Sequence, residues 1–261
     1  MAIWWLAGVA LADPFQSKLP AEGVNLVRVD VHAGDVRIWP DAEGHVEFRG
    51  EKLNWTEQCS AEATRTGEVV SLTVRNAGMA LVAPCEVRWS IHVTPEMGLQ
   101  IRMGQGSLVI PAMRGRTFLN VGNGDIRLED VGGPLTLTLG NGVVEGAYVG
   151  PELKATVGNG GLHVHNLVSP VTASTNVGDI ALTWLVVPPG RIRASNRVGS
   201  VRIELPPQAQ VEIAARAGLG KKRIEFPHTP GAPTRVEVET QVGTVHVTTK
   251  AGPQVEDGSL E

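Results

Sequence analysis

Two aspartates are the first residues in this sequence whose type and spacing could do chemistry. Asp125 and Asp179 each follow a glycine in a motif that recurs every 18 residues, and three such periods separate them. A glycosidase needs two carboxyl groups roughly 5 to 9.5 Å apart. If each period is one coil of stacked strands, three coils place these carboxyl groups about 14 Å apart. We therefore predict no catalytic residues, and we interpret both aspartates as turn residues that bond their own backbone.

The same motif invites a calcium interpretation, because two nine-residue calcium-binding repeats also make 18 residues. Those repeats carry an aspartate each, whereas this chain has at most one per 18-residue period. Calcium requires six to eight oxygen ligands, which such a column cannot supply. We predict no calcium site.

Histidine and cysteine offer little for a transition metal. His163 and His165 share one strand face, and solvated surface histidines explain them better than a metal site does. Cys59 and Cys85 are the only cysteines and have no CxxC spacing, which argues against zinc. No metal and no cofactor are therefore predicted.

The element that positions all of these residues is an internal repeat. Glycines recur with a step of 18 at Gly106, Gly124, Gly142, Gly160 and Gly178. Apolar residues recur in register, for example at Leu108, Ile126, Val144, Leu162 and Ile180. A fixed period this short is typical of a solenoid, in which each repeat buries its apolar face against the next.

One repeat contains two short strands and two corners. Residues 119–121 and 126–128 alternate between apolar and polar, which is the period of a strand with one buried face. Gly122–Gly124 and Gly132–Pro134 turn the chain between them. We predict an all-β fold, a β-solenoid with 18-residue coils. An antiparallel meander is the alternative, because Asn-Gly is also a strong hairpin signal.

Amide side chains recur at one corner of four successive coils, at Gln105, Asn123, Asn141 and Asn159. Stacked at about 4.8 Å, such amides can hydrogen-bond from coil to coil as a ladder. The alternative is that each asparagine only supplies a turn residue with a left-handed backbone.

The outward positions of one strand column are rich in hydroxyl groups. The residues of this hydroxyl-rich strip are Thr136, Thr138, Lys154, Thr156, Thr172 and Ser174, after Phe118 and Asn120 one coil earlier. The strip could dock a repetitive ligand such as an envelope glycan, although threonine is also simply a good exposed strand residue. The Thr-x-Thr pattern of an ice-binding surface occurs cleanly only at Thr136 and Thr138.

The flanking regions set the domain organisation that we expect. Residues 1–12 resemble the end of a secretory signal peptide, with an A-x-A pattern before Asp13. A single solenoid domain is expected over 24–249, with irregular opening coils at 24–100, regular coils at 101–185 and widened coils at 186–249. A disordered tail is expected at 250–261.

An exported chain with two cysteines favours a Cys59–Cys85 disulfide, with two buried thiols as the alternative. It would close a loop of about 26 residues and stabilise the fold by about 3 kcal/mol. No segment is apolar for long enough to span a bilayer, since residues 3–12 are too few. The net charge of −4 is spread along the chain, so no nucleic-acid partner is expected.

The order of motifs resembles a known family. An opening V-x-V-x-x-x-x-G-D-V strand pair is followed by V-x-W-S-I-H-V-T-P at 87–95 and then by G-D-I repeats. This pattern is similar to the bacterial putative-adhesin family of exported β-solenoid domains, whose biochemical role is undefined. The resemblance implies a right-handed β-helix-like fold, an envelope location and no catalytic residues.

Together, these features favour a non-enzymatic cell-envelope module that presents a rigid face to a protein or glycan partner. We expect it in the periplasm, on the cell surface or secreted. The alternative is a carbohydrate-active β-helix enzyme, a lyase or glycosidase, which would need two acidic groups converging on one sugar. The sequence does not indicate an oligomeric state.

Overall fold

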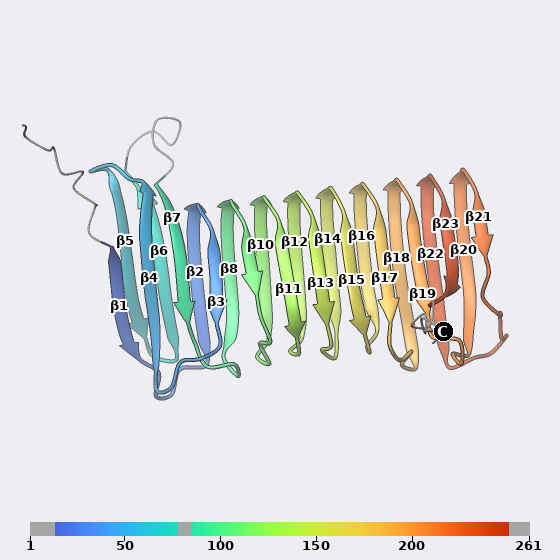
Figure 1. Cartoon of the computed structure of the whole chain (residues 1–261), viewed down its shortest axis with the longest axis horizontal. Coiled ribbons are helices and arrows are strands. Elements are labelled where there is room, and N and C mark those ends of the chain that lie inside the picture. Colours follow the sequence, from blue (N-terminus) through green and yellow to red (C-terminus); the bar gives the residue numbers. More distant parts are fainter. Residues whose placement is uncertain (1–13, 78–84, 251–261) are drawn as a thin grey trace, which may run out of the picture.

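A computed structural model describes residues 14–77 and 85–250 of the chain, and those residues form β-strands joined by turns. The strands wind as a solenoid with two strands per coil, which confirms the predicted fold class (Figure 1). No helix that could cross a membrane occurs among the described residues. The signal-peptide remnant and the tail fall outside these ranges, apart from Asp13's neighbour Pro14 and the start of the tail at Lys250.

Two layers of parallel strands enclose the core. The first face contains, in spatial order, β6 (Val69–Asn76), β2 (Leu26–Ala33), β8 (Gly98–Gln105), β10 (Thr117–Asn123), β12 (Leu135–Asn141), β14 (Leu153–Asn159), β16 (Val171–Val177), β18 (Gly190–Val198), β22 (Thr234–Val242) and β20 (Val211–Leu219). The second face contains, in the same order, β7 (Glu86–His92), β3 (Val36–Trp39), β9 (Leu108–Ile110), β11 (Ile126–Val131), β13 (Val144–Tyr148), β15 (Leu162–Leu167), β17 (Ile180–Trp184), β19 (Val201–Leu205), β23 (Val245–Thr249) and β21 (Lys222–Ile224).

The 18-residue period is the register of these faces. Leu119 pairs with Leu137 and Leu137 with Ala155, so buried side chains stack on buried side chains along the axis. Because β10, β12 and β14 run parallel, the antiparallel meander is wrong. The repeat fixes the faces, and the faces hold every outward side chain in a straight row.

The glycine of each corner is required by two separate constraints. Gly124 has a φ of 134°, a backbone conformation that side chains disfavour. A Cβ atom on Gly124 would also lie 1.9 Å from the carbonyl oxygen of Gly106 in the preceding coil. The coils therefore approach one another closely at this corner only because the residue there has no side chain.

The two ends of the solenoid depart from chain order, which the sequence analysis did not anticipate. The pair β2/β3 lies between β6/β7 and β8/β9, although it precedes both in the chain (Figure 1). The pair β22/β23 likewise lies between β18/β19 and β20/β21. At both ends, therefore, the chain skips one coil position and later fills it, or fills it first.

Antiparallel strands cover the first coil. β5 (Cys59–Thr66) pairs with β6, β4 (His45–Asn54) pairs with β7, and β1 (Phe15–Pro20) pairs with β4. Such strands block an edge that would otherwise invite pairing with another chain. The sheet thus begins with β1, upstream of residue 24.

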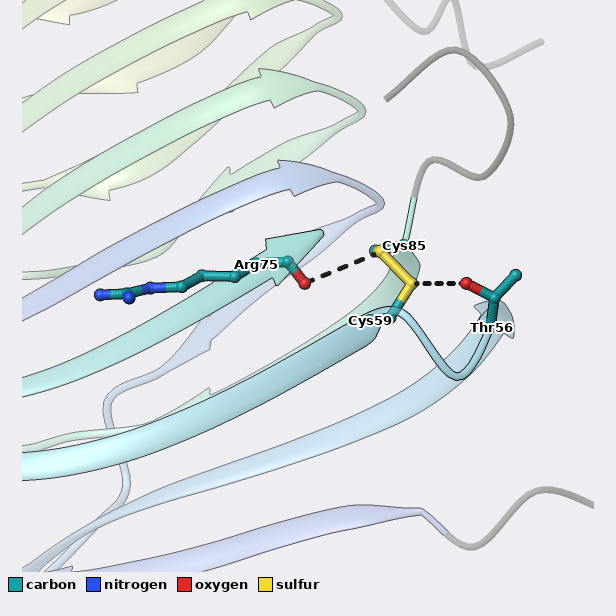
Figure 2. Close-up of a disulfide and its surroundings, with 4 residues drawn as sticks. All are labelled: Thr56, Cys59, Arg75 and Cys85. Atoms are coloured by element: carbon teal, nitrogen blue, oxygen red, sulfur yellow. Dashed lines mark hydrogen bonds between the residues drawn. A yellow bond between two sulfur atoms is a disulfide. The ribbon is translucent and has the colours of Figure 1, made fainter. Parts of the chain in front are cut away.

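A disulfide closes this capped end. Cys59 at the start of β5 is bonded to Cys85 just before β7, and both residues are buried (Figure 2). The Thr56 hydroxyl lies 3.5 Å from Cys59 Sγ, and Cys85 Sγ lies 3.9 Å from the Arg75 carbonyl oxygen. The bond ties the antiparallel cap to the first parallel coil.

Candidate ligand-binding face

The hydroxyl-rich strip lies on the outer surface of the first face. One row consists of Thr136, Lys154 and Thr172, and the next of Thr138, Thr156 and Ser174. All six side chains are exposed or half-buried. Strand pairing holds the rows straight, so successive side chains along a row lie about 4.8 Å apart.

Few contacts occupy the polar groups of the strip. The Ser174 hydroxyl lies 3.4 Å from Thr156 Oγ1 in the preceding coil. Lys154 Nζ lies 2.7 Å from Glu152 Oε1, and this hydrogen bond lowers the pKa of the Glu152 carboxyl. The other threonine hydroxyls in the two rows remain available at the surface for an external partner.

The two rows continue into a charged region near the C-terminal end. Thr172 is followed along its row by Arg193, Glu237 and Ala214, and Ser174 is followed by Ser195, Glu239 and Arg216. Because Ala214 is short among long side chains, a hollow of about 430 Å³ opens there. We call it the terminal hollow; it is lined by Arg193, Ser195, Ala214, Arg216, Arg235, Glu237 and Glu239.

Sequence reasoning missed the terminal hollow. After Trp184 the repeat length changes, so the column of each outward residue could not be assigned from spacing. The available signal was the alternation of arginine or glutamate with apolar residues over 191–194 and 235–239, which marks outward positions.

Glu237 is the most strongly engaged acid in the terminal hollow. Its carboxylate accepts a hydrogen bond from Arg193 at 2.8 Å and lies 3.1 Å from Arg235 Nε and 3.5 Å from Arg191 Nε. The Arg193 hydrogen bond and the nearby guanidinium charges lower the pKa of Glu237. A general acid needs the opposite shift, so this carboxylate is an ion-paired anion rather than a proton donor.

The asparagine corner forms a coil-to-coil ladder of three side chains. Asn141 Nδ2 donates to Asn123 Oδ1 at 2.7 Å, and Asn159 Nδ2 donates to Asn141 Oδ1 at 2.8 Å. No side-chain hydrogen bond joins Gln105 to this ladder within the described ranges. Positive φ falls on the following glycines and on none of the three asparagines, so the left-handed-turn alternative is wrong here.

The turn aspartates bond the next coil rather than their own backbone, which corrects our interpretation of them. Asp125 Oδ1 accepts from the Val143 N–H at 2.9 Å, and Asp179 Oδ1 accepts from the Ser200 N–H at 2.7 Å. Asp35 does the same with Ser107, whose hydrogen bonds lower the pKa of the Asp35 carboxyl. These carboxylates therefore fasten one coil to the next.

The two histidines of β15 point outward from the second face and are exposed. His163 lines a shallow hollow with Asp179, Arg202 and His246. Over residues 14–77 and 85–250, no three His, Cys, Asp or Glu side chains converge as a metal site would require.

Comparisons with known proteins add shape but no function. No protein-family model matches the chain, and no curated protein matches it. A solved "putative adhesin" from Parabacteroides merdae aligns over 92% of this chain and 97% of its own, with 13% identity and a TM-score of 0.45. A "putative adhesin" from Bacteroides fragilis aligns over 90% and 97%, with 15% identity and a TM-score of 0.40. A "putative cell adhesion protein" from Clostridium sporogenes aligns over 91% and 100%, with 13% identity and a TM-score of 0.32. These likenesses carry no weight below, and the solenoid assignment rests on the strand register.

Proposed function

We propose that this protein is a non-enzymatic envelope module whose hydroxyl-rich strip binds an extended glycan. The observation that carries the proposal is the pair of straight polar rows, which repeat at the strand spacing of about 4.8 Å on a rigid parallel sheet. Hydroxyl groups both donate and accept hydrogen bonds, as sugar hydroxyls do, so each coil can repeat the same contact. A rigid face also loses little conformational entropy on binding.

Export of the domain is part of this proposal. The Cys59–Cys85 bond supports it, because disulfides persist in oxidising compartments outside the cytoplasm. The periplasm, the cell surface and the medium all meet that condition.

The carbohydrate-active enzyme alternative is less well supported. Asp125 and Asp179 are three coils apart and both bond backbone N–H groups of the next coil. Glu237 is surrounded by arginines, which keep it ionised. Neither arrangement supplies the paired acid and base that glycoside hydrolysis uses.

The test is retention on an envelope glycan, with purified peptidoglycan sacculi as the probe. The variant Thr138→Glu/Thr156→Glu places carboxylates in the strip, and we expect it to abolish co-sedimentation. The matched control His163→Glu/His165→Glu changes two outward residues of the opposite face and should bind like the unmodified protein. No retention of the unmodified protein, or equal retention of both double variants, would overturn the proposal. Release of reducing ends that Glu237→Gln abolishes would instead establish an enzyme.

A further inference from the structure

An exposed row of aliphatic side chains continues the asparagine ladder along the same corner. Asn159 pairs with Val177, Val177 with Val198, Val198 with Val242, and Val242 with Leu219. We call the four apolar members the aliphatic ridge; their exposed fractions are 43% for Val177, 41% for Val198, 43% for Val242 and 71% for Leu219.

The ridge is contiguous, which distinguishes it from scattered surface apolar residues. Four successive coils at about 4.8 Å make a line about 14 Å long. Single exposed apolar residues are normal on protein surfaces, whereas contiguous ones mark interaction sites. At this corner the three preceding coils carry asparagine, so the fold itself does not require an apolar residue there.

Cations flank the ridge. Arg197 precedes Val198 and makes only a hydrogen bond to the neutral Asn176 side chain. Lys221 and Lys222 follow Leu219 closely and are exposed, and neither makes an ion pair within the described part of the chain. Asp179 is the acid beside this corner, and one of its carboxylate oxygens already accepts the Ser200 N–H.

The open end of the solenoid adds a concavity beside Leu219. A hollow of about 610 Å³ is lined by Ala215 and Ala217 of β20, with Arg216, Lys222 and the single acid Glu239. Lys222 occupies the register position that holds the buried Val245 in the neighbouring coil. The last coil thus presents an ammonium group where the other coils bury an aliphatic side chain.

We propose that the aliphatic ridge docks this protein on the surface of an anionic phospholipid bilayer. The ridge would enter the boundary between headgroups and acyl chains, with Lys221, Lys222 and Arg197 against lipid phosphates. Apolar burial combined with attraction to anionic lipid is how peripheral surfaces bind membranes. The charge pattern disfavours a second copy as the occupant, because a two-fold contact at this corner would bring the Lys221–Lys222 pairs together. The inference is independent of the hydroxyl-rich strip.

The first test is co-sedimentation of the full chain with vesicles of phosphatidylcholine alone or with 30% phosphatidylglycerol. We expect binding to the anionic vesicles that weakens with salt. Lys221→Gln/Lys222→Gln should weaken it roughly 25-fold, at about five-fold per lysine. Leu219→Gln should weaken it roughly ten-fold. Lys18→Gln and Val186→Gln remove an exposed lysine and an exposed valine elsewhere and should leave it unchanged.

The second test locates the contact independently of any other membrane-binding segment. Because the two cysteines are disulfide-bonded, a cysteine introduced by Leu219→Cys can be labelled alone with an environment-sensitive dye. Its emission should shift to the blue with anionic vesicles, whereas the dye at Val186→Cys should not shift. Equal responses at both positions, or no response at residue 219, would overturn the proposal. A concentration-dependent dimer that Leu219→Gln abolishes, without any vesicle response, would overturn it in favour of a second copy.

Discussion

The middle rung of the asparagine ladder gives the sharpest stability test. Asn141→Ala removes one hydrogen bond donated to Asn123 and one accepted from Asn159. Asn159→Ala removes only the bond to Asn141. Alanine is suitable at both positions because neither residue has a positive φ.

The expected magnitudes follow from the number of bonds. A typical intramolecular hydrogen bond contributes about 0.5 to 1.5 kcal/mol to the free energy of unfolding. All three asparagines are exposed, so water satisfies part of what is lost and the lower half of that range applies. We expect losses of about 1 to 1.5 kcal/mol for Asn141→Ala and about 0.5 kcal/mol for Asn159→Ala.

Urea unfolding followed by circular dichroism and by tryptophan fluorescence measures this difference. With a slope near 3 kcal/mol per molar urea, Asn141→Ala should lower the midpoint by about 0.3 to 0.5 M. Gln105→Ala is the control and should leave the midpoint unchanged, because that side chain does not join the ladder. The reasoning fails if Asn159→Ala lowers the midpoint as much as Asn141→Ala does.

Three further predictions concern the corners, the core and the capped end. Gly142→Ala should cost at least about 3 kcal/mol in thermal unfolding, because its Cβ would lie 1.9 Å from a carbonyl oxygen at a φ of 134°; Gly231→Ala, with a φ of 72° and open space, should cost far less. Thr175→Val should stabilise the protein by about 1 kcal/mol in the same assay, since the buried Thr175 hydroxyl has no hydrogen-bond partner among described residues and Val157 fills that position one coil earlier; a lower midpoint would contradict this. The pKa of the Glu47 carboxyl is lowered from 4.5 to about 2, so the stability it contributes is full above pH 4.5 and is lost as the pH falls toward 2; Glu47→Gln should therefore be less stable at pH 7 and show a flatter acid limb over that window.

The regular coils could be predicted from the sequence because their physics is local and repeated. The glycine step and the alternation of Leu119 and Val121 with Asn120 fix strand length, turn position and register together. The swapped positions at both ends could not be predicted, because β2 would satisfy the same apolar pattern beside either β6 or β8 and in fact pairs with both. Periodicity identifies a strand, but it does not identify the neighbour of that strand.

The candidate site divides along the same line. The rows through Thr138 and Thr156 followed from spacing, since each strand there is one period from the next. The continuation to Glu239 and Arg216 depends on which coil lies beside β18, and chain order suggests β20 where the structure has β22. The aspartate and asparagine partners were misjudged or left open for a related reason, since local turn chemistry and coil-to-coil bonding use the same residue types.

The swapped coils at both ends determine how the molecule would bear a mechanical load. A conventional solenoid pulled by its ends can lose its last coil by peeling, one hydrogen bond at a time. Here β22/β23, the last described strands, are held between β18/β19 and β20/β21, and β2/β3 are likewise enclosed. Tension on the C-terminus must therefore shear two strand interfaces at once, and the outermost coil bears none of that tension directly. An envelope module tethered through its chain ends would resist extension without any additional cross-link at its C-terminal end.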